Sequence, residues 1–205
     1  MAIISNAVTI ADAGAFSVGL GNMELIKSIT ASNVSSVSLV HGTSSVVLNN
    51  TYKTYLIELI NIHADTNDQG FSFNFSIDSG SNYNVTKTTT NIRAVHGEDA
   101  SGGTLTYRGN ADLAQGTGNQ PLGESSAGGN NDANLCGKIW LFDPSNTTFV
   151  KHFMYDTTNM ANGDDAEHVQ CAGYCNTTSA VNGWTLTVGS GTFDGIVKLY
   201  GFKDS

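Results

Sequence analysis

Phe71-Ser-Phe-Asn-Phe-Ser-Ile77 is the stretch of this 205-residue sequence that decides its fold. Because successive side chains of a β-strand point to opposite faces, the strict apolar–polar alternation predicts a half-buried strand. Its predicted buried face carries Phe71, Phe73, Phe75 and Ile77. Asp78-Ser-Gly-Ser-Asn82 has the composition of a turn, so residues 83–89 are predicted to complete a hairpin with this strand.

Strand-like segments recur along the rest of the chain. No run of ten or more residues shows the stripe of an amphipathic helix. Short apolar or alternating runs recur about every 8 to 15 residues, a spacing typical of sandwiches and jelly rolls. The further predicted strands are residues 25–30, 35–40, 55–62, 135–142, 148–155, 169–175, 184–188 and 196–200. We therefore expect an all-β, jelly-roll-like antiparallel β-sandwich with an extended N-terminal arm.

The predicted sandwich comprises residues 25–205, preceded by an arm of residues 1–24. The arm has small and apolar side chains but too few to form a core, so it needs a neighbour, either the body of the chain or another subunit. The residues expected to make that contact are Ile3, Ile4, Val8, Ile10, Phe16 and Leu20. Within the sandwich, residues 97–131 hold nine of the 23 glycines and form a long irregular insertion. Loops of that length are commonly functional or mobile.

Charge and hydropathy restrict the class of partner. The formal net charge is −9, and the nine lysines and arginines are scattered singly. Nucleic-acid binding is not expected, because phosphate recognition needs clustered cations. No segment reaches the roughly 18 apolar residues of a membrane span, and the first ten residues lack the features of a secretory signal. We therefore expect a soluble chain with no membrane partner.

Catalytic and metal-binding motifs are not found in the sequence. G-x-S-x-G, H-E-x-x-H and the Walker loop are absent, so we expect no catalytic residue, no metal and no cofactor. Cys171 and Cys175 would lie about 13 Å apart on one strand, too far for a disulfide. With Cys136 they are predicted to be free thiols. The alternatives are a zinc site that includes His168, a calcium site at residues 98–99 or 164–167, and polysaccharide cleavage by paired carboxylates.

A possible ligand loop lies inside the insertion. Most tyrosines and both tryptophans fall in predicted strands, where core packing is the simpler interpretation. Tyr107 is the exception, and with Arg108 and Asp112 it could contact a ligand such as a glycan. We expect a short strand near residues 104–108 within the same insertion.

Residues 25–203 resemble a recurring module of virion proteins from marine bacteriophages of the cyanophage and pelagiphage type. The resemblance rests on the combination of several short sequence segments (words), because each segment alone is a weak signal. The words include Leu25-Ile-Lys-Ser-Ile-Thr-Ala31, Ile60-Asn-Ile-His63, Asp78-Ser-Gly-Ser-Asn-Tyr-Asn-Val-Thr-Lys-Thr-Thr-Thr90, Phe142-Asp-Pro-Ser-Asn-Thr-Thr-Phe-Val-Lys-His-Phe153 and Lys198-Leu-Tyr-Gly201.

The resemblance implies a non-enzymatic structural protein of the virion, assembled in the host cytoplasm. In other members the module is often attached to fibre-like regions, whereas here only the short arm precedes it. The leading expectation is therefore a capsid decoration or cement protein, bound to the major capsid protein or another virion protein. By analogy with three-fold sites on shells, we expect a homotrimer. The alternative is a tail-fibre or tail-tip adhesin module that binds a host surface glycan.

Overall fold

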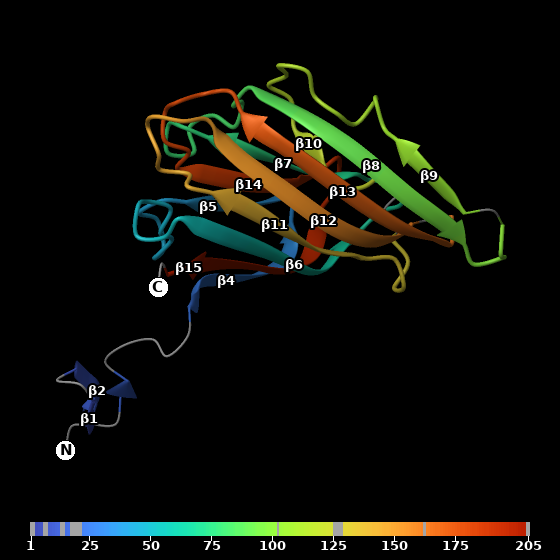
Figure 1. Cartoon of the computed structure of the whole chain (residues 1–205). Coiled ribbons are helices and arrows are strands. Elements are labelled where there is room, and N and C mark those ends of the chain that lie inside the picture. Colours follow the sequence, from blue (N-terminus) through green and yellow to red (C-terminus); the bar gives the residue numbers. More distant parts are fainter. Residues whose placement is uncertain are drawn as a thin grey trace.

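The computed structural model describes residues 22–101, 103–124, 129–161 and 163–203, together with the backbone of three short N-terminal strands (Figure 1). These strands are β1 (Ile3–Ser5), β2 (Val8–Asp12) and β3 (Ala15–Phe16). They pair with one another in antiparallel fashion, in the order β1-β2-β3. No helix of the described residues is long and apolar enough to cross a membrane.

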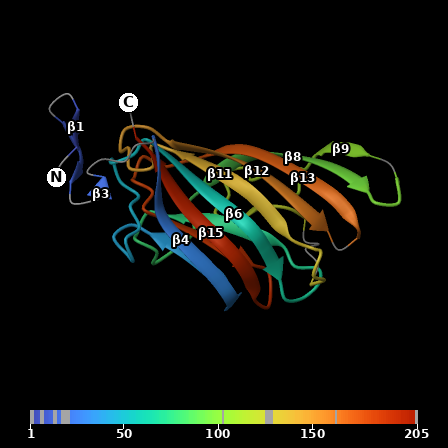
Figure 2. The same ribbon diagram turned by 90° about the horizontal axis from the view of Figure 1, so that it is seen from below.

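Two antiparallel sheets form the body of the protein, which confirms the predicted β-sandwich. The large sheet has eight strands in the order β4-β15-β6-β11-β12-β13-β8-β9, which run side by side in Figure 2. They are β4 (Met23–Val34), β15 (Phe193–Phe202), β6 (Thr54–Ala64), β11 (Leu135–Phe142), β12 (Lys151–Ala161), β13 (Asp165–Cys175), β8 (Lys87–Gly97) and β9 (Thr104–Tyr107). The small sheet has four strands, β10 (Gln120–Pro121), β7 (Phe71–Ser76), β14 (Gly183–Val188) and β5 (Ser36–Val40).

The chain crosses repeatedly between the two sheets. β4, β6, β11 and β15 lie in the large sheet, while β5, β7, β10 and β14 lie in the small sheet. In chain order these eight strands alternate between the layers except at β7 and β10, which follow one another in the small sheet, and this alternation resembles that of a jelly roll. The pairs β8–β9 and β12–β13 are added to the large sheet beyond β11. The large sheet therefore continues past the jelly roll by these four strands. Their inner face, which is turned toward the small sheet, must be covered by another part of the chain.

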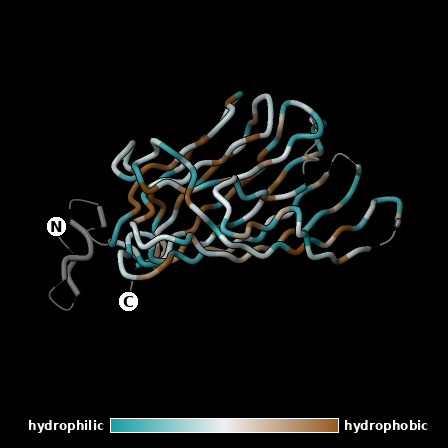
Figure 3. The backbone as a smooth tube through the Cα atoms, turned by 90° about the horizontal axis from the view of Figure 1, so that it is seen from above, coloured by the Kyte–Doolittle hydropathy of each residue, from teal (hydrophilic) through white to brown (hydrophobic). Residues whose placement is uncertain are grey.

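The hydrophobic core lies between the sheets and is centred on β7. Phe71, Phe73 and Phe75 are buried, as the alternation predicts. The ring of Phe73 packs edge-on against Phe153 and Tyr155, with 5.7 Å between centroids in each pair. Along the strands, hydrophobic and hydrophilic segments alternate (Figure 3). This packing joins the central strands of the two layers.

Two details of the prediction around β7 are wrong. Ile77 is 42% exposed, because β7 ends at Ser76 and Asp78 begins a turn by accepting hydrogen bonds from the Ser76 hydroxyl and the Asn82 backbone. The predicted hairpin is also absent, since β8 begins at Lys87 and pairs in the large sheet. β7 already has β10 and β14 on its two edges, so no edge is left for residues 83–89.

The first strand of the sandwich begins close to residue 25. β4 begins at Met23, two residues before the predicted start of the sandwich at residue 25. β1, β2 and β3 are short strands within the predicted arm. The short strand expected within the insertion is confirmed as β9.

We predict that Phe73→Ala lowers the free energy of unfolding by about 3–5 kcal/mol, because it removes a buried ring from the centre of the core. Urea unfolding followed by fluorescence would measure this change. The matched control is Phe149→Ala, since Phe149 is 69% exposed and should change stability by less than about 0.5 kcal/mol. Equal losses in the two variants would contradict the packing described above.

Candidate functional site

The insertion between β8 and β11 is bound along the edges of both sheets. After β9, the Arg108 amide donates to the Asn91 carbonyl at 2.9 Å, and the Thr89 amide donates to the Leu113 carbonyl at 2.9 Å. Gly116 exchanges backbone hydrogen bonds with Lys87 at the same edge of β8. β10 then pairs with β7 in the small sheet. Residues 108–121 therefore bridge the two sheets instead of projecting as an open loop.

Beneath this bridge lies a buried polar network. The Thr89 hydroxyl donates to Gln120 Oε1 at 2.8 Å, and the Gln120 amide donates to the Ala111 carbonyl at 2.9 Å. The Tyr155 hydroxyl accepts a hydrogen bond from Asn91 Nδ2 at 2.8 Å and donates to the Pro121 carbonyl. Burial raises the pKa of Tyr155 well above its usual value. The network therefore joins β8 and β12 to the insertion.

A group of charged side chains closes the same end of the sandwich. Glu167 is buried on the inner face of β13, where it accepts from the Glu124 amide and from Asn159 Nδ2, each at 3.2 Å. Arg93 pairs with Glu124 and lies 3.5 Å from Glu167. Arg108 Nη2 lies 3.7 Å from Glu124 Oε1. We call Arg93, Arg108, Glu124 and Glu167 the ion cluster.

The residues predicted to form a ligand loop are separated by the structure. Arg108 is 8% exposed and belongs to the ion cluster, where burial lowers the pKa of its guanidinium. Tyr107 is 55% exposed, and its hydroxyl donates to Asp112 Oδ2 at 2.6 Å. Consecutive residues at the end of a strand face opposite sides, which explains why Tyr107 and Arg108 diverge. Tyr107 and Asp112 form a small exposed pair, and Arg108 is not available to a ligand with them.

The predicted arm contacts fall on the N-terminal strands. Ile3 and Ile4 lie on β1, Val8 and Ile10 on β2, and Phe16 on β3. Leu20 lies outside the described residues. The contact of these residues with a partner stays a prediction.

The acidic segments and the cysteines do not form a metal site in the part of the chain that the structure describes. The Glu98 amide donates to the Asp164 carbonyl at 2.9 Å, which brings the two acidic segments together. No three His, Cys, Asp or Glu side chains of the described residues converge on a position for a metal. Cys171 and Cys175 are free and buried, and burial raises the pKa of each to about 12. His168 lies on the exposed face of β13, 2.8 Å from Asp156.

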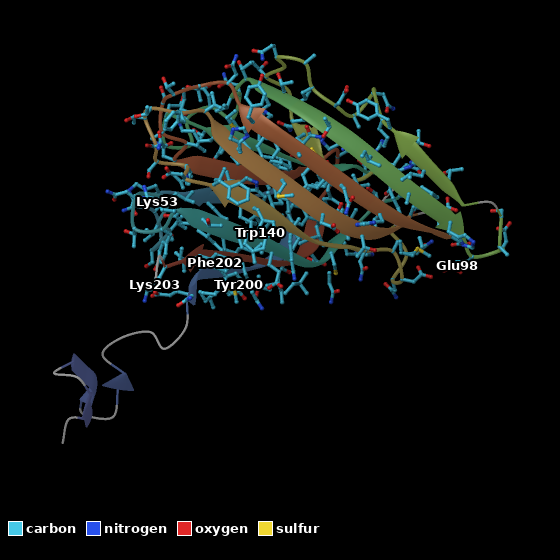
Figure 4. All side chains as sticks on the ribbon, viewed as in Figure 1. Lys53, Glu98, Trp140, Tyr200, Phe202 and Lys203 are labelled. Carbon is cyan, nitrogen blue, oxygen red and sulfur yellow. The ribbon has the colours of Figure 1, made fainter. Side chains whose placement is uncertain are left out.

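The outer face of the large sheet carries aromatic side chains that we had expected in the core. Tyr200, Leu56, Trp140, Met154 and Ala172 follow one another in register across five strands. Figure 4 shows Trp140, Tyr200 and Phe202 together on this face. We define the aromatic band as the rings of Trp140, Phe142, Tyr174, Tyr200 and Phe202 together with the apolar side chain of Met154, all half-buried or exposed.

The sequence did contain a signal for the aromatic band. Along β11, Leu135, Ile139 and Leu141 are buried, and Trp140 has the same parity as Lys138, which is exposed. Because parity fixes the face, the charged neighbour indicates that Trp140 points outward. The general preference of tryptophan for burial led to the wrong prediction.

A row of polar side chains runs beside the aromatic band. Lys198, Glu58, Lys138, Asp156 and Gln170 follow one another in register across the sheet. Asp156 accepts hydrogen bonds from Gln170 Nε2 at 3.0 Å and pairs with His168. We call these five residues and His168 the polar row. Donors and acceptors therefore lie next to exposed rings.

Shallow grooves flank the central side chains of this face. A groove of about 380 Å³ lies between Trp140, Met154 and the small residues Thr90 and Ala172. A second of about 400 Å³ reaches Phe142, His152 and Tyr174, and a third of about 540 Å³ lies between Glu58, Lys138 and Trp140.

The candidate functional site is therefore the outer face of the large sheet, with the aromatic band, the polar row and the grooves between them. No protein-family model matches the chain, and neither the curated proteins nor the solved structures contain a match.

Two buried lysines lie on either side of Cys175. The register pairs Cys175 with Lys151 on β12 and with Lys87 on β8. Lys87 Nζ donates to Asn74 Oδ1 at 2.6 Å and to the Val85 carbonyl at 2.7 Å. Because burial disfavours the ammonium, the pKa of Lys87 falls to about 8. Nothing in the sequence pattern predicted these buried charges.

We predict that Glu167→Ala lowers the free energy of unfolding by about 1–3 kcal/mol, because it removes the buried carboxylate that accepts from the Glu124 amide and from Asn159 and leaves these donors without that acceptor. The amide hydrogens of residues 108–124 should also exchange faster with solvent. Chemical unfolding and hydrogen exchange would measure both effects. The control is Asp156→Ala, which breaks an exposed pair with His168 and should cost less than about 1 kcal/mol. A Glu167→Ala protein as stable as this control would exclude a stabilising ion cluster.

We predict a pH-dependent stability difference between the wild type and Lys87→Met. Above about pH 8 the folded state releases the Lys87 proton, while the unfolded state keeps it until its usual value of 10.5. The unfolded state then binds more protons, so the wild type should gain about 1 kcal/mol relative to Lys87→Met between about pH 8 and pH 9.

Urea unfolding of both proteins with a reducing agent would measure this difference. The buried cysteines lower stability as the pH rises, but they act in both proteins and largely cancel in the comparison. Lys138→Met, at an exposed position, serves as the control and should follow the wild type. A pH-independent difference would show that Lys87 titrates normally.

Proposed function

We propose that this chain is a non-enzymatic structural protein of a bacteriophage particle, a capsid decoration or cement protein on its surface. Its partner would be the major capsid protein or another virion protein, met after synthesis in the host cytoplasm. The resemblance of residues 25–203 to marine phage virion modules supports the proposal. The jelly-roll sandwich is compatible with it, although the fold alone does not assign a function.

The observation that carries the proposal is that the buried polar and charged side chains make structural contacts. Tyr155, Arg108 and Glu167 are the kinds of side chain that could serve in catalysis, but here they bind the insertion to the sheets. On the outer face, Cys136 accepts a hydrogen bond from the Asn61 amide at 3.2 Å, while His168 pairs with Asp156. These contacts hold segments of the fold together, which supports a structural role.

In this proposal the arm attaches the sandwich to the particle. Ile3, Ile4, Val8, Ile10, Phe16 and Leu20 would pack against the shell or a neighbouring copy. A homotrimer at three-fold positions would suit such attachment. The net charge of −9 accords with a partner other than nucleic acid.

A second candidate function is a tail-fibre or tail-tip adhesin. The aromatic band and its grooves favour it, because exposed rings beside polar groups are typical of ligand-binding surfaces. The insertion gives less support to an adhesin than the sequence suggested, because Arg108 is buried and not available to a ligand.

We predict a high copy number in purified virions. Quantitative mass spectrometry against the major capsid protein should give about one copy per capsid subunit, or one trimer per three-fold site, because a decoration protein follows the symmetry of the shell. A few tens of copies or fewer would overturn the decoration role and place the chain in the tail.

Variants of the arm would test the attachment. Ile4→Asp with Val8→Asp should reduce the copy number, because charge at these positions opposes burial of the arm. Leu105→Asp is the matched control, since Leu105 is 77% exposed on β9. Full incorporation of the arm variant would show that another surface attaches the protein.

A further inference from the structure

We propose that the outer face of the large sheet binds a neutral glycan chain, with sugar rings packed on the aromatic band and sugar hydroxyls hydrogen-bonded to the polar row. This site is distinct from the ligand loop that the sequence suggested at Tyr107, Arg108 and Asp112. It does not depend on where in a particle the chain resides.

The apolar half of the site is held in place before a ligand arrives. The rings of Trp140 and Phe202 are 5.3 Å apart with an interplanar angle of 39°. Met154, the register neighbour of Trp140, is 48% exposed. Large flat side chains fixed by neighbours lose little entropy on binding, and the apolar C–H faces of sugar rings pack well on such surfaces.

The polar half offers hydrogen bonds of both kinds. The Asp156 carboxylate accepts, the Gln170 amide can donate and accept, and Lys138 donates. Partial burial alone would raise the pKa of Asp156, but hydrogen bonds from Gln170 and His168 lower it. Asp156 therefore remains an ionised acceptor beside Trp140, within the groove that both residues line. A ligand with many hydroxyl groups matches this arrangement.

The charges of the polar row favour a neutral ligand. Lys198 Nζ lies 3.9 Å from Glu58 Oε2, and Asp156 lies 2.8 Å from the His168 ring. With Lys138, the row holds two lysines and two carboxylates, so its formal charges balance and give no net attraction to an anionic or cationic polymer.

The same row argues against a second copy of the chain as the occupant. The centres of protein–protein interfaces are depleted of charged residues. Here Glu58, Lys138 and Asp156 cross the middle strands of the face. A sugar chain can hydrogen-bond to these groups and leave them partly hydrated.

The shape of the site favours an extended ligand. The grooves are shallow and adjacent, and they share Trp140 or Met154 as walls. Small ligands are usually enclosed in a deep cleft, whereas a polysaccharide can extend along connected grooves. Ala172 and Thr90 deepen one groove because their side chains are small.

Affinity electrophoresis of the purified full-length protein tests the proposal. The probes are soluble neutral polysaccharides (a β-glucan, a mannan and a galactan), with alginate as an anionic comparison. We expect at least one neutral polysaccharide to retard the wild type, and Trp140→Ala to weaken that retardation about tenfold or more. Asp156→Ala, at an exposed position, should also weaken it. Phe149→Ala, which removes an exposed ring outside the band, should bind like the wild type.

Fluorescence provides a second readout that does not depend on mobility. The chain has two tryptophans, Trp140 and the fully buried Trp184. In Trp184→Phe, the remaining emission reports on Trp140 and should shift when the glycan binds. Thermal melting would confirm that each variant is folded.

Several results would overturn the proposal. They are the absence of retardation by every neutral polysaccharide, unchanged binding by Trp140→Ala, or retardation by alginate alone. Self-association of the wild type that Trp140→Ala abolishes, without any glycan binding, would assign the face to a second copy. None of these results would alter the copy number in virions, so the failure of this inference and that of the proposed function can be distinguished.

Discussion

The large sheet has eight strands and the small sheet four, and the rest of the structure depends on this mismatch. The strands added beyond β11 have an inner face that the small sheet alone does not complete. The insertion covers it through Gln120 and through the neighbouring ion cluster. That cover supplies backbone and polar groups as well as Leu122, and the inner face beneath it carries polar side chains such as Thr89 and Thr157. Glu167 is buried there with the Glu124 amide of the insertion as a partner, while Asn91 donates to Tyr155, whose hydroxyl donates to the Pro121 carbonyl of the insertion.

The same extension gives the large sheet its broad outer face. Residues of β11, β12 and β13 form the middle of that face, and alternation places Trp140 and Asp156 outward while Ile139 and Tyr155 point inward. One set of strands thus supplies both the buried network and the exposed aromatic band. A change of register by one residue would exchange the two faces, so the core and the outer surface constrain one another.

Much of the fold could be predicted from alternation, but the environment of single residues could not. The face of Phe73 and the existence of β9 followed from local pattern. The partner of β8 did not, because the edges of β7 are occupied by strands distant in sequence. The burial of Arg108 and Lys87 depends on the insertion and on cross-strand neighbours, which periodicity does not report. Trp140 was predictable from its parity with Lys138, but propensity pointed the other way.

The position of β15 between β4 and β6 has a kinetic consequence. Lys198 pairs with Ser28 on one side and with Glu58 on the other, so strands distant in sequence must meet before the sheet is complete. Such pairings slow folding, because the entropy of closing a long loop is lost before the contacts form. During synthesis, β4 and β6 emerge long before β15 and present unpaired edges that other chains can join. The interval between these events is therefore the period when this protein is most exposed to aggregation.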